Sequence, residues 1–185
     1  AAVSDPLLLS LVETKAGTLD ISNEEIRAIL DRVKTIEDVR IVVKEVMAMK
    51  KAFRVSRIVE VIVAGAIALG ASDIHVEPED EFIRLRYRLD GVLTDVLLFD
   101  KETYQLLLSR LKLLSGLKLN IKDTAQDGRF SVFLKGSEIE IRTSIIPGAY
   151  GESIVMRLLD PETISVPFEK LGMEALLTPS IKKIA

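Results

Sequence analysis

The stretch QDGRFSVFLKGSEIEIRTSIIPGAYGESIVMRLLD, residues 126–160, decides the fold class of this chain. Its apolar and polar residues alternate with period two, which is typical of strands that bury one face. Turn-forming residues at Gly136-Ser137 and at 147–151 interrupt the alternation. We therefore predict three short strands joined by turns, at 129–135, 138–146 and 152–159.

The predicted turns bring three arginines into one neighbourhood of the sheet. With a two-residue first turn, Arg129 faces Ser144 on the next strand. With a symmetric four-residue second loop, Arg142 faces Arg157. The opposite face of the three strands carries Phe130, Val132, Leu134, Ile139, Ile141, Ile145, Ile154, Met156 and Leu158.

Two interpretations of the clustered arginines are open. Like charges that face one another across a sheet are unfavourable, so a bound anion would explain why they gather there. The simpler interpretation is a solvated face on which Glu138 and Glu140 neutralise the arginines. Geometry alone favours the simpler interpretation, because surface charge pairs are common and weak.

Composition excludes several kinds of site. The 185 residues, 48% hydrophobic and 29% charged, suit one ordinary domain with an appendage. A net charge of −3 gives no general attraction to nucleic acid, so no nucleic-acid partner is expected. The chain has no cysteine and a single histidine, His75, which excludes disulfides, thiolate metal sites and histidine clusters. The longest apolar run, Ile58 to Ala71, is too short to span a bilayer.

Helical patterns dominate the first 70 residues. A capping-box sequence at 22–25 predicts one short helix, and a second is expected to follow Thr35. A third is expected at 56–69, ending at Gly70. Its second half is apolar all round, which favours a central position in the core.

The remaining elements complete the predicted fold. We expect strands at 72–77, 82–89 and 92–98, a hairpin turn at Asp90-Gly91, and a helix from Asp100 to Ser115. This order predicts an α+β domain with a mostly antiparallel sheet and helices on one face, preceded by a small helical segment.

Two other groups of charged residues have simple explanations. The alternate arginines of 84–88 share a face without interleaved aromatic residues, which indicates a solvated or subunit-contacting face rather than a nucleic-acid groove. Asp73, His75 and Glu77 alternate along one strand, where three ligands rarely converge on a metal ion, so no metal site is predicted. No glycine-rich loop is followed by Lys-Ser/Thr, so the chain by itself cannot form a P-loop ATPase site.

Seven short motifs occur in order along the chain: ASDIHVEP at 71–78, RLRYRLDGVL at 84–93, SRLKLLSGL at 109–117, QDGR at 126–129, IRTS at 141–144, GESIVMRLLD at 151–160 and LGM at 171–173. Together they resemble the type II secretion and type IV pilus assembly ATPases over roughly residues 54–185. Several motifs in a fixed order make this resemblance highly specific.

The resemblance implies a domain organisation. Residues 1–52 would be a helical subdomain or linker, 53–160 a PAS-like α/β domain, and 161–185 a linker and the start of a RecA-like motor domain. The first 50 residues match no motif of the family. Because the chain begins with Ala and ends within a helical pattern, we expect it to be a piece of a longer protein.

The resemblance also implies a chemistry. The family's motor forms hexameric rings, and ATP with Mg²⁺ is bound between the motor and the PAS-like domain. Arg142 and Arg157 match the two arginines that reach the phosphates, so they are the expected catalytic and ATP-binding residues, in an arginine-finger role. Arg129 is expected to make an auxiliary contact. Ser153 stands where many relatives have arginine, which weakens any third phosphate contact there.

The implied partners are the protein's own motor domain, five further copies in a homo-hexamer, and inner-membrane platform proteins. The implied location is cytoplasmic and peripheral to the inner membrane. Secretion and pilus assembly are not distinguished by the sequence. The alternative, from another class, is a PAS-like interaction or ligand-sensing module without a catalytic role, for which a small molecule bound inside the fold would be the sign.

Overall fold

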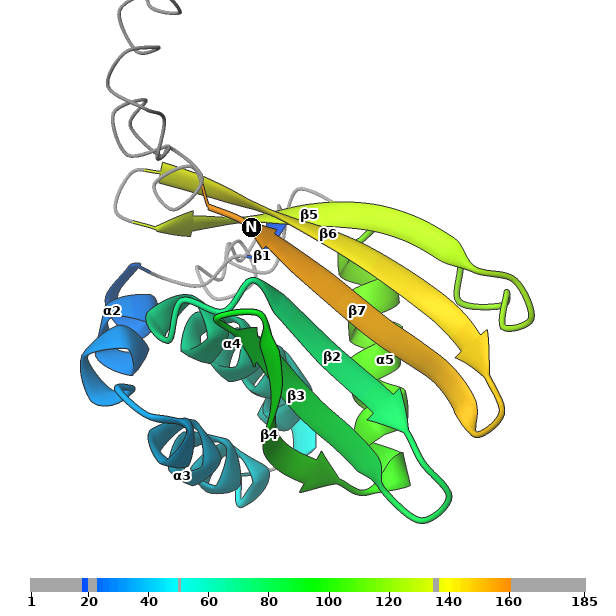
Figure 1. Ribbon diagram of the computed structural model, residues 1–185, viewed down its shortest axis with the longest axis horizontal. Helices are drawn as coiled ribbons and strands as arrows, with labels where there is room; N and C mark the ends of the chain where they lie inside the picture. The colour runs from blue at the N-terminus through cyan, green and yellow to red at the C-terminus, as the bar shows by residue number, and fades with distance from the viewer. Residues whose placement is uncertain (1–17, 20–22, 50, 135–136, 161–185) are drawn as a thin grey trace, which may run out of the picture.

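The computed structural model describes residues 18–19, 23–49, 51–134 and 137–160. Its elements follow the order β1 (Thr18–Leu19), α2 (Asn23–Arg32), α3 (Ile36–Met47), α4 (Lys51–Ala68), β2 (Asp73–Pro78), β3 (Ile83–Leu89), β4 (Val92–Phe99), α5 (Lys101–Leu114), β5 (Gln126–Leu134), β6 (Ser137–Gly148) and β7 (Gly151–Leu159). The strands form one sheet in the order β1-β5-β6-β7-β2-β3-β4 (Figure 1). Only the short β1–β5 pair is parallel.

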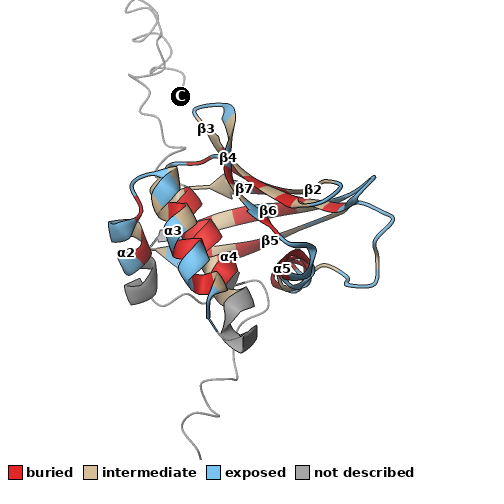
Figure 2. Cartoon of the chain, turned by 90° about the horizontal axis from the view of Figure 1, so that it is seen from below, coloured by how far each residue is buried: buried red, intermediate tan, exposed pale blue. Residues whose placement is uncertain are grey.

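The helices lie on one side of this sheet, which confirms the predicted α+β class (Figure 2). The apolar face predicted for β5 to β7 is buried against them, apart from Leu134 and Leu158, which are half-buried. Burial of this face requires the period-two alternation to hold along every strand. Most charged side chains of the strands lie on the opposite face.

Helix α4 occupies the central position that its apolar sequence predicts. The helix begins at Lys51, earlier than the predicted start at residue 56, and Ser56 lies inside it. Gly65 allows close packing, since a Cβ atom there would lie 3.1 Å from Val39 Cγ2 and 3.2 Å from Tyr87 Oη. The buried Tyr87 hydroxyl donates a 2.6 Å hydrogen bond to the carbonyl of Ile62.

The helical segment before α4 shares the same core. Thr35 caps α3 in a reciprocal capping box with Asp38, which places the buried stripe of α3 against α4. Buried side chains of α2 and α3, Ile29 and Val39 among them, belong to the hydrophobic cluster that also lines the sheet. The proposed division of the chain at residue 52 stays a prediction. The capping-box residue Ser22, and everything expected from residue 161 onward, lie outside the described residues.

The register of the first predicted hairpin is wrong by two residues. Leu134 pairs with Ser137, and Arg129 therefore faces Arg142 instead of Ser144. A shift of two residues keeps every side chain on its own face. The hydrophobic pattern therefore cannot distinguish the two registers, and only the place of the turn decides between them.

The second hairpin has the predicted register but a shorter loop. Gly148 pairs with Gly151, which leaves only residues 149–150 in the turn. Because the strands lengthen equally on both sides, Arg142 still faces Arg157 as predicted. The hairpin at Asp90-Gly91 is also confirmed, with φ values of 48° and 81° that suit a type I′ turn.

A buried ion pair attaches α5 to the start of β7, and nothing in the sequence patterns indicated it. Lys112 Nζ lies 2.6 Å from Glu152 Oε1 and donates a 2.8 Å hydrogen bond to the carbonyl of Ile121. The Tyr104 hydroxyl donates to the carbonyl of Glu152. Burial of both charges is tolerated because each has a partner of opposite charge.

In the described part of the chain, no helix has both the length and the apolar composition needed to cross a membrane.

Gly128→Ala should destabilise the fold, because β5 passes very close to the end of α5. A Cβ atom at this position would lie 2.2 Å from the carbonyl oxygen of Ser115 and 2.8 Å from Leu117 Cδ2. We expect the free energy of unfolding to fall by about 1 to 3 kcal/mol, the usual cost of overpacking. Urea denaturation measures the change. Glu138→Ala, at an exposed position of the neighbouring strand, is the control and should stay within about 0.5 kcal/mol.

Candidate functional site

Five charged residues form a row across the outer face of the sheet, one on each of five neighbouring strands. Arg129 on β5 faces Arg142 on β6, which faces Arg157 on β7. The row continues with Asp73 on β2 and Arg88 on β3. The structure therefore brings all three predicted site residues together and adds two that the sequence analysis did not assign to the site.

The members of this row differ sharply in exposure. The side chains of Arg142 and Arg157 are 68% and 67% exposed, whereas that of Asp73 is only 6% exposed. Asp73 lies on the outer face, yet it is buried between Arg157 and Arg88. Burial of a carboxylate requires partners that satisfy its charge and its acceptor oxygens.

Asp73 has three such partners. Arg157 Nε donates to Oδ1 at 2.9 Å, and Arg88 Nε lies 3.2 Å from Oδ2. The Ser72 hydroxyl donates to Oδ2 at 2.8 Å. Burial by itself would raise the pKa of Asp73, but the hydrogen bonds from Arg157 and Ser72 and the charges of both arginines outweigh it and lower the pKa below its ordinary value. The carboxylate is therefore ionised at neutral pH.

Glu140 neutralises part of the charge at the other end of the row. Its carboxylate lies 3.0 Å from Arg142 Nε and 3.4 Å from Arg129 Nη1. This agrees with the simpler interpretation made from the sequence, in which glutamates compensate the arginines. Among the described residues, the four arginines of the row form ion pairs with only two carboxylates, those of Asp73 and Glu140.

The way Arg142 and Arg157 are held leaves part of each guanidinium available. Both use Nε for the ion pair, and the terminal nitrogens of both have no partner among the described residues. A guanidinium presents its donors as a rigid fork that matches the oxygens of phosphate or carboxylate. Two exposed forks on directly facing residues can therefore bind one anion from two sides.

An open hollow of about 480 Å³ lies beside Arg129 and Arg142. Asp127 and Ser144, which are hydrogen-bonded to each other, line it further along the same two strands. Its size falls within the range typical of small-ligand sites, although it is wide open to solvent. Arg129 and Arg142 thus border accessible space, and none of the described helices covers this side of the sheet (Figure 2).

The charged residues at the other end of the outer face, on β2 to β4 and the loop after β2, are engaged with one another. Arg84 pairs with Glu79 at 2.6 Å and with Asp95 at 3.2 Å. Arg86 forms an ion pair with Glu77, which also lies 3.5 Å from His75 Nδ1. Of the residues that alternate along β2, Asp73 and Glu77 are therefore taken up by arginines, and a solvated charge network describes this region.

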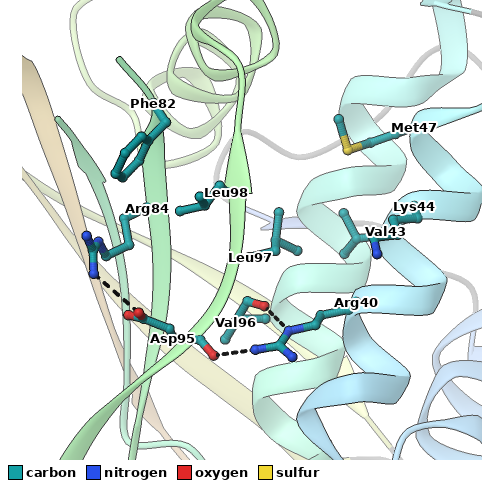
Figure 3. A pocket seen from close by; sticks show the side chains of 10 residues that line it. All are labelled: Arg40, Val43, Lys44, Met47, Phe82, Arg84, Asp95, Val96, Leu97 and Leu98. Atoms are coloured by element: carbon teal, nitrogen blue, oxygen red, sulfur yellow. Dashed lines mark hydrogen bonds and ion pairs between the residues drawn. The ribbon is translucent and has the colours of Figure 1, made fainter. Parts of the chain in front are cut away.

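A larger hollow of about 570 Å³ lies between α3 and the edge strand β4 (Figure 3). Arg40 reaches across it from α3 and donates hydrogen bonds to the carbonyls of Asp95 and Val96, next to an irregularity in the β3–β4 pairing. These bonds occupy backbone acceptors of an edge strand that could otherwise pair with another chain. The hollow contains none of the predicted site residues, so we do not assign the function to it.

Sequence reasoning missed the place of Asp73 and Arg88 in the row. Arg157 and Asp73 are 84 positions apart, and only the pairing of β7 with β2 makes them neighbours. The one local signal was the pair of alternating patterns in 73–77 and 84–88, whose antiparallel pairing puts Asp73 opposite Arg88 and Glu77 opposite Arg84. The strand order needed to use that signal was unknown.

Comparison with known proteins adds an independent line of evidence. Residues 48–185 match the family model of type II/IV secretion system proteins. The chain is 38% identical over 130 residues to type II secretion system protein E of Xanthomonas campestris pv. campestris, covering 70% of this chain and 23% of the relative. It is 31% identical over 175 residues to the type IV pilus assembly ATPase PilB of Myxococcus xanthus, covering 94% of this chain and 28% of the relative. The chain thus spans about a quarter of the length of these relatives.

Asp73→Asn should lower stability at neutral pH and lose that effect in acid. The folded-state pKa of Asp73 lies below the ordinary value of 3.8, so its stabilisation is present above that value and disappears as the pH falls through the folded-state pKa. At pH 7 we expect a loss of about 1 to 2 kcal/mol in the free energy of unfolding, as for other hydrogen bonds to charged groups.

Urea denaturation of both proteins at a series of pH values checks this expectation. The two free energies of unfolding should converge below the ordinary value of 3.8. A difference that persists unchanged in acid would show that the ion pairs of Asp73 contribute nothing. Asp80→Asn, at an exposed position after β2, serves as the matched control.

Proposed function

Since the chain belongs to the type II/IV secretion system protein family, we propose that it supplies arginines to the phosphates of ATP bound by a RecA-like motor. Arg142 and Arg157 are the proposed catalytic and ATP-binding residues, and Arg129 makes an auxiliary contact. The proposed activity belongs to a whole protein of the relatives' size. The matching parts cover only about a quarter of the length of those relatives.

One observation carries the proposal. Arg142 and Arg157 face each other directly, each is tethered through Nε, and their terminal nitrogens have no partner among the described residues. Facing like charges repel, and an anion that both can bind relieves the repulsion. The triphosphate of ATP is such an anion, with several equivalent oxygens that suit guanidinium donors.

The chemistry fits what arginine contributes to phosphoryl transfer. Negative charge is spread over the oxygens of the transferred γ-phosphoryl group in the transition state, and correctly placed guanidinium groups stabilise it. Because the ion pairs with Asp73 and Glu140 already restrict the two side chains, less conformational freedom is lost when they bind. In this role Arg142 and Arg157 stabilise negative charge and transfer no proton.

Arg129 and Ser153 have lesser parts in the proposal. Arg129 is next to Arg142 in the row, but its ion pair with Glu140 uses a terminal nitrogen, which leaves fewer donors for a ligand. Ser153 faces Ile146, several residues along β7 from Arg157, and its short side chain offers no third guanidinium. Arg142 and Arg157 therefore provide the main phosphate contacts, and Arg129 provides an auxiliary one.

The motor completes the site in this proposal. The sequence contains no phosphate-binding loop, so the nucleotide and its Mg²⁺ would be held by the RecA-like domain, and the outer face of this sheet would close over the phosphates. A homo-hexamer on the cytoplasmic side of the inner membrane, working with platform proteins there, would couple hydrolysis to secretion or to pilus assembly. The family name covers both processes.

Arg142→Ala and Arg157→Ala, each made in the full-length protein with its motor, should reduce the ATPase rate by about 10³-fold, as for other arginine fingers. Lysine at either position should fail to restore the rate, because it keeps the charge but lacks the fork of donors. Steady-state phosphate release measures the effect, with size-exclusion chromatography to check assembly.

Arg32→Ala is the matched control, since Arg32 is an exposed arginine on α2 that pairs with Glu45. It should leave the ATPase rate within about twofold of the unaltered protein, as expected of an exposed residue far from the site. The 185-residue chain alone should hydrolyse no ATP. Normal turnover by both Arg142→Ala and Arg157→Ala would return these residues to the simpler role of a solvated surface.

A further inference from the structure

We propose that Asp73 is a positioning residue that holds the Arg157 guanidinium in place for the phosphates, with Arg88 and Ser72 fixing Asp73 itself. This inference rests on the proposed function and extends it from the arginines to the groups behind them. Asp73 touches no phosphate in this scheme and acts only through Arg157.

The hydrogen-bond geometry is the first support. Oδ1 of Asp73 accepts from Arg157 Nε, while Oδ2 accepts from the Ser72 hydroxyl and lies within ion-pair distance of Arg88 Nε. With both oxygens engaged from different sides, the carboxylate cannot rotate without losing a partner. The orientation of Asp73 is therefore fixed before any ligand arrives.

The contrast in burial is the second support. Arg157 is 67% exposed, and a free arginine side chain has about 2 kcal/mol of rotamer entropy to lose. Its Nε edge is fixed on a carboxylate that is only 6% exposed, while its terminal nitrogens have no partner among the described residues. Asp73, on β2, thus restricts the Arg157 side chain, which has no partner within its own strand β7.

The backbone around Asp73 is the third support. Asp73 is the first residue of β2, in the middle of the sheet between β3 and β7. The neighbouring residue Ser72 makes a backbone hydrogen bond of 3.0 Å to each adjacent strand. Its amide donates to the carbonyl of Arg88, and its carbonyl accepts from the amide of Leu158. A rigid central strand can hold a reactive group to within the small tolerance that catalysis requires.

Glu140 does not offer the same support to Arg142. It lies two residues away on the same strand, is 32% exposed, and divides its carboxylate between Arg142 and Arg129. Its bonds are accessible to water and weaker as a restraint. Asp73 is therefore the better candidate for a positioning role.

A simpler role for Asp73 would be to neutralise charge and stabilise the sheet. The two roles predict different kinetics. A residue that orients Arg157 for the transition state affects kcat, whereas removal of a negative charge alone makes the row more positive and lowers KM for ATP. Coupling to Arg157 provides a second distinction, because a residue that acts through Arg157 has no effect once Arg157 is gone.

The experiment is a double-mutant cycle on the ATPase activity of the full-length protein, with Asp73→Asn, Arg157→Ala and the combination. We expect Asp73→Asn to lower kcat about tenfold or more, in line with the cost of misplacing a catalytic group, without raising KM for ATP. The combined variant should match Arg157→Ala within about twofold. Ser72→Ala, which removes only one of the bonds to Asp73, should lower kcat in the same direction by less.

Each outcome decides between the proposals. If Arg157→Ala lowers kcat but Asp73→Asn leaves it normal, or if the two losses multiply, the positioning role is overturned and the proposed function stands. If Arg157→Ala itself has normal kcat, the proposed function fails first. Circular dichroism and size-exclusion chromatography identify a variant that does not fold, and Ser72→Ala then carries the test. Asp80→Asn is the control for loss of a carboxylate at an exposed position.

Discussion

Burial of one face of the sheet against α4 and α5 is the constraint on which the rest of the structure depends. It forces apolar side chains to every second position of the strands and leaves the other positions to water. Because cross-strand neighbours on the uncovered face lie close together, charges placed there must either pair with one another or bind something else. In the row from Arg129 to Arg88, each of the four arginines pairs with one of two carboxylates, those of Asp73 and Glu140.

The arginines of the uncovered face pair with carboxylates that differ in burial. Arg84 and Arg86 find carboxylates close by in the chain and use them to form a solvated network. Arg157 instead pairs with the carboxylate of Asp73, a buried residue in the middle of the sheet that is 84 positions away in the sequence. A site with one rigid, buried acid behind an exposed guanidinium is better suited to preorganised binding than a surface where every charge is equally mobile.

The edges and ends of the sheet are closed by different means. Arg40 occupies carbonyls of the edge strand β4, the buried pair of Lys112 and Glu152 attaches α5 to β7, and Gly128 lets β5 pass against the end of α5. None of these contacts follows from periodicity, since each depends on where two elements distant in sequence meet. Together they hold the strands that carry the arginine row at fixed positions.

The sequence by itself determined the α+β class, which face of each strand is buried, most element boundaries and the pairing of Arg142 with Arg157. These follow from local rules, namely period-two alternation, capping residues and turn residues. Only the tertiary structure decided that Arg129 faces Arg142, because a register shift of two residues leaves the hydrophobic pattern unchanged. It also decided that Asp73 lies between Arg157 and Arg88, since strand order is set by packing of the whole sheet and no local pattern encodes it.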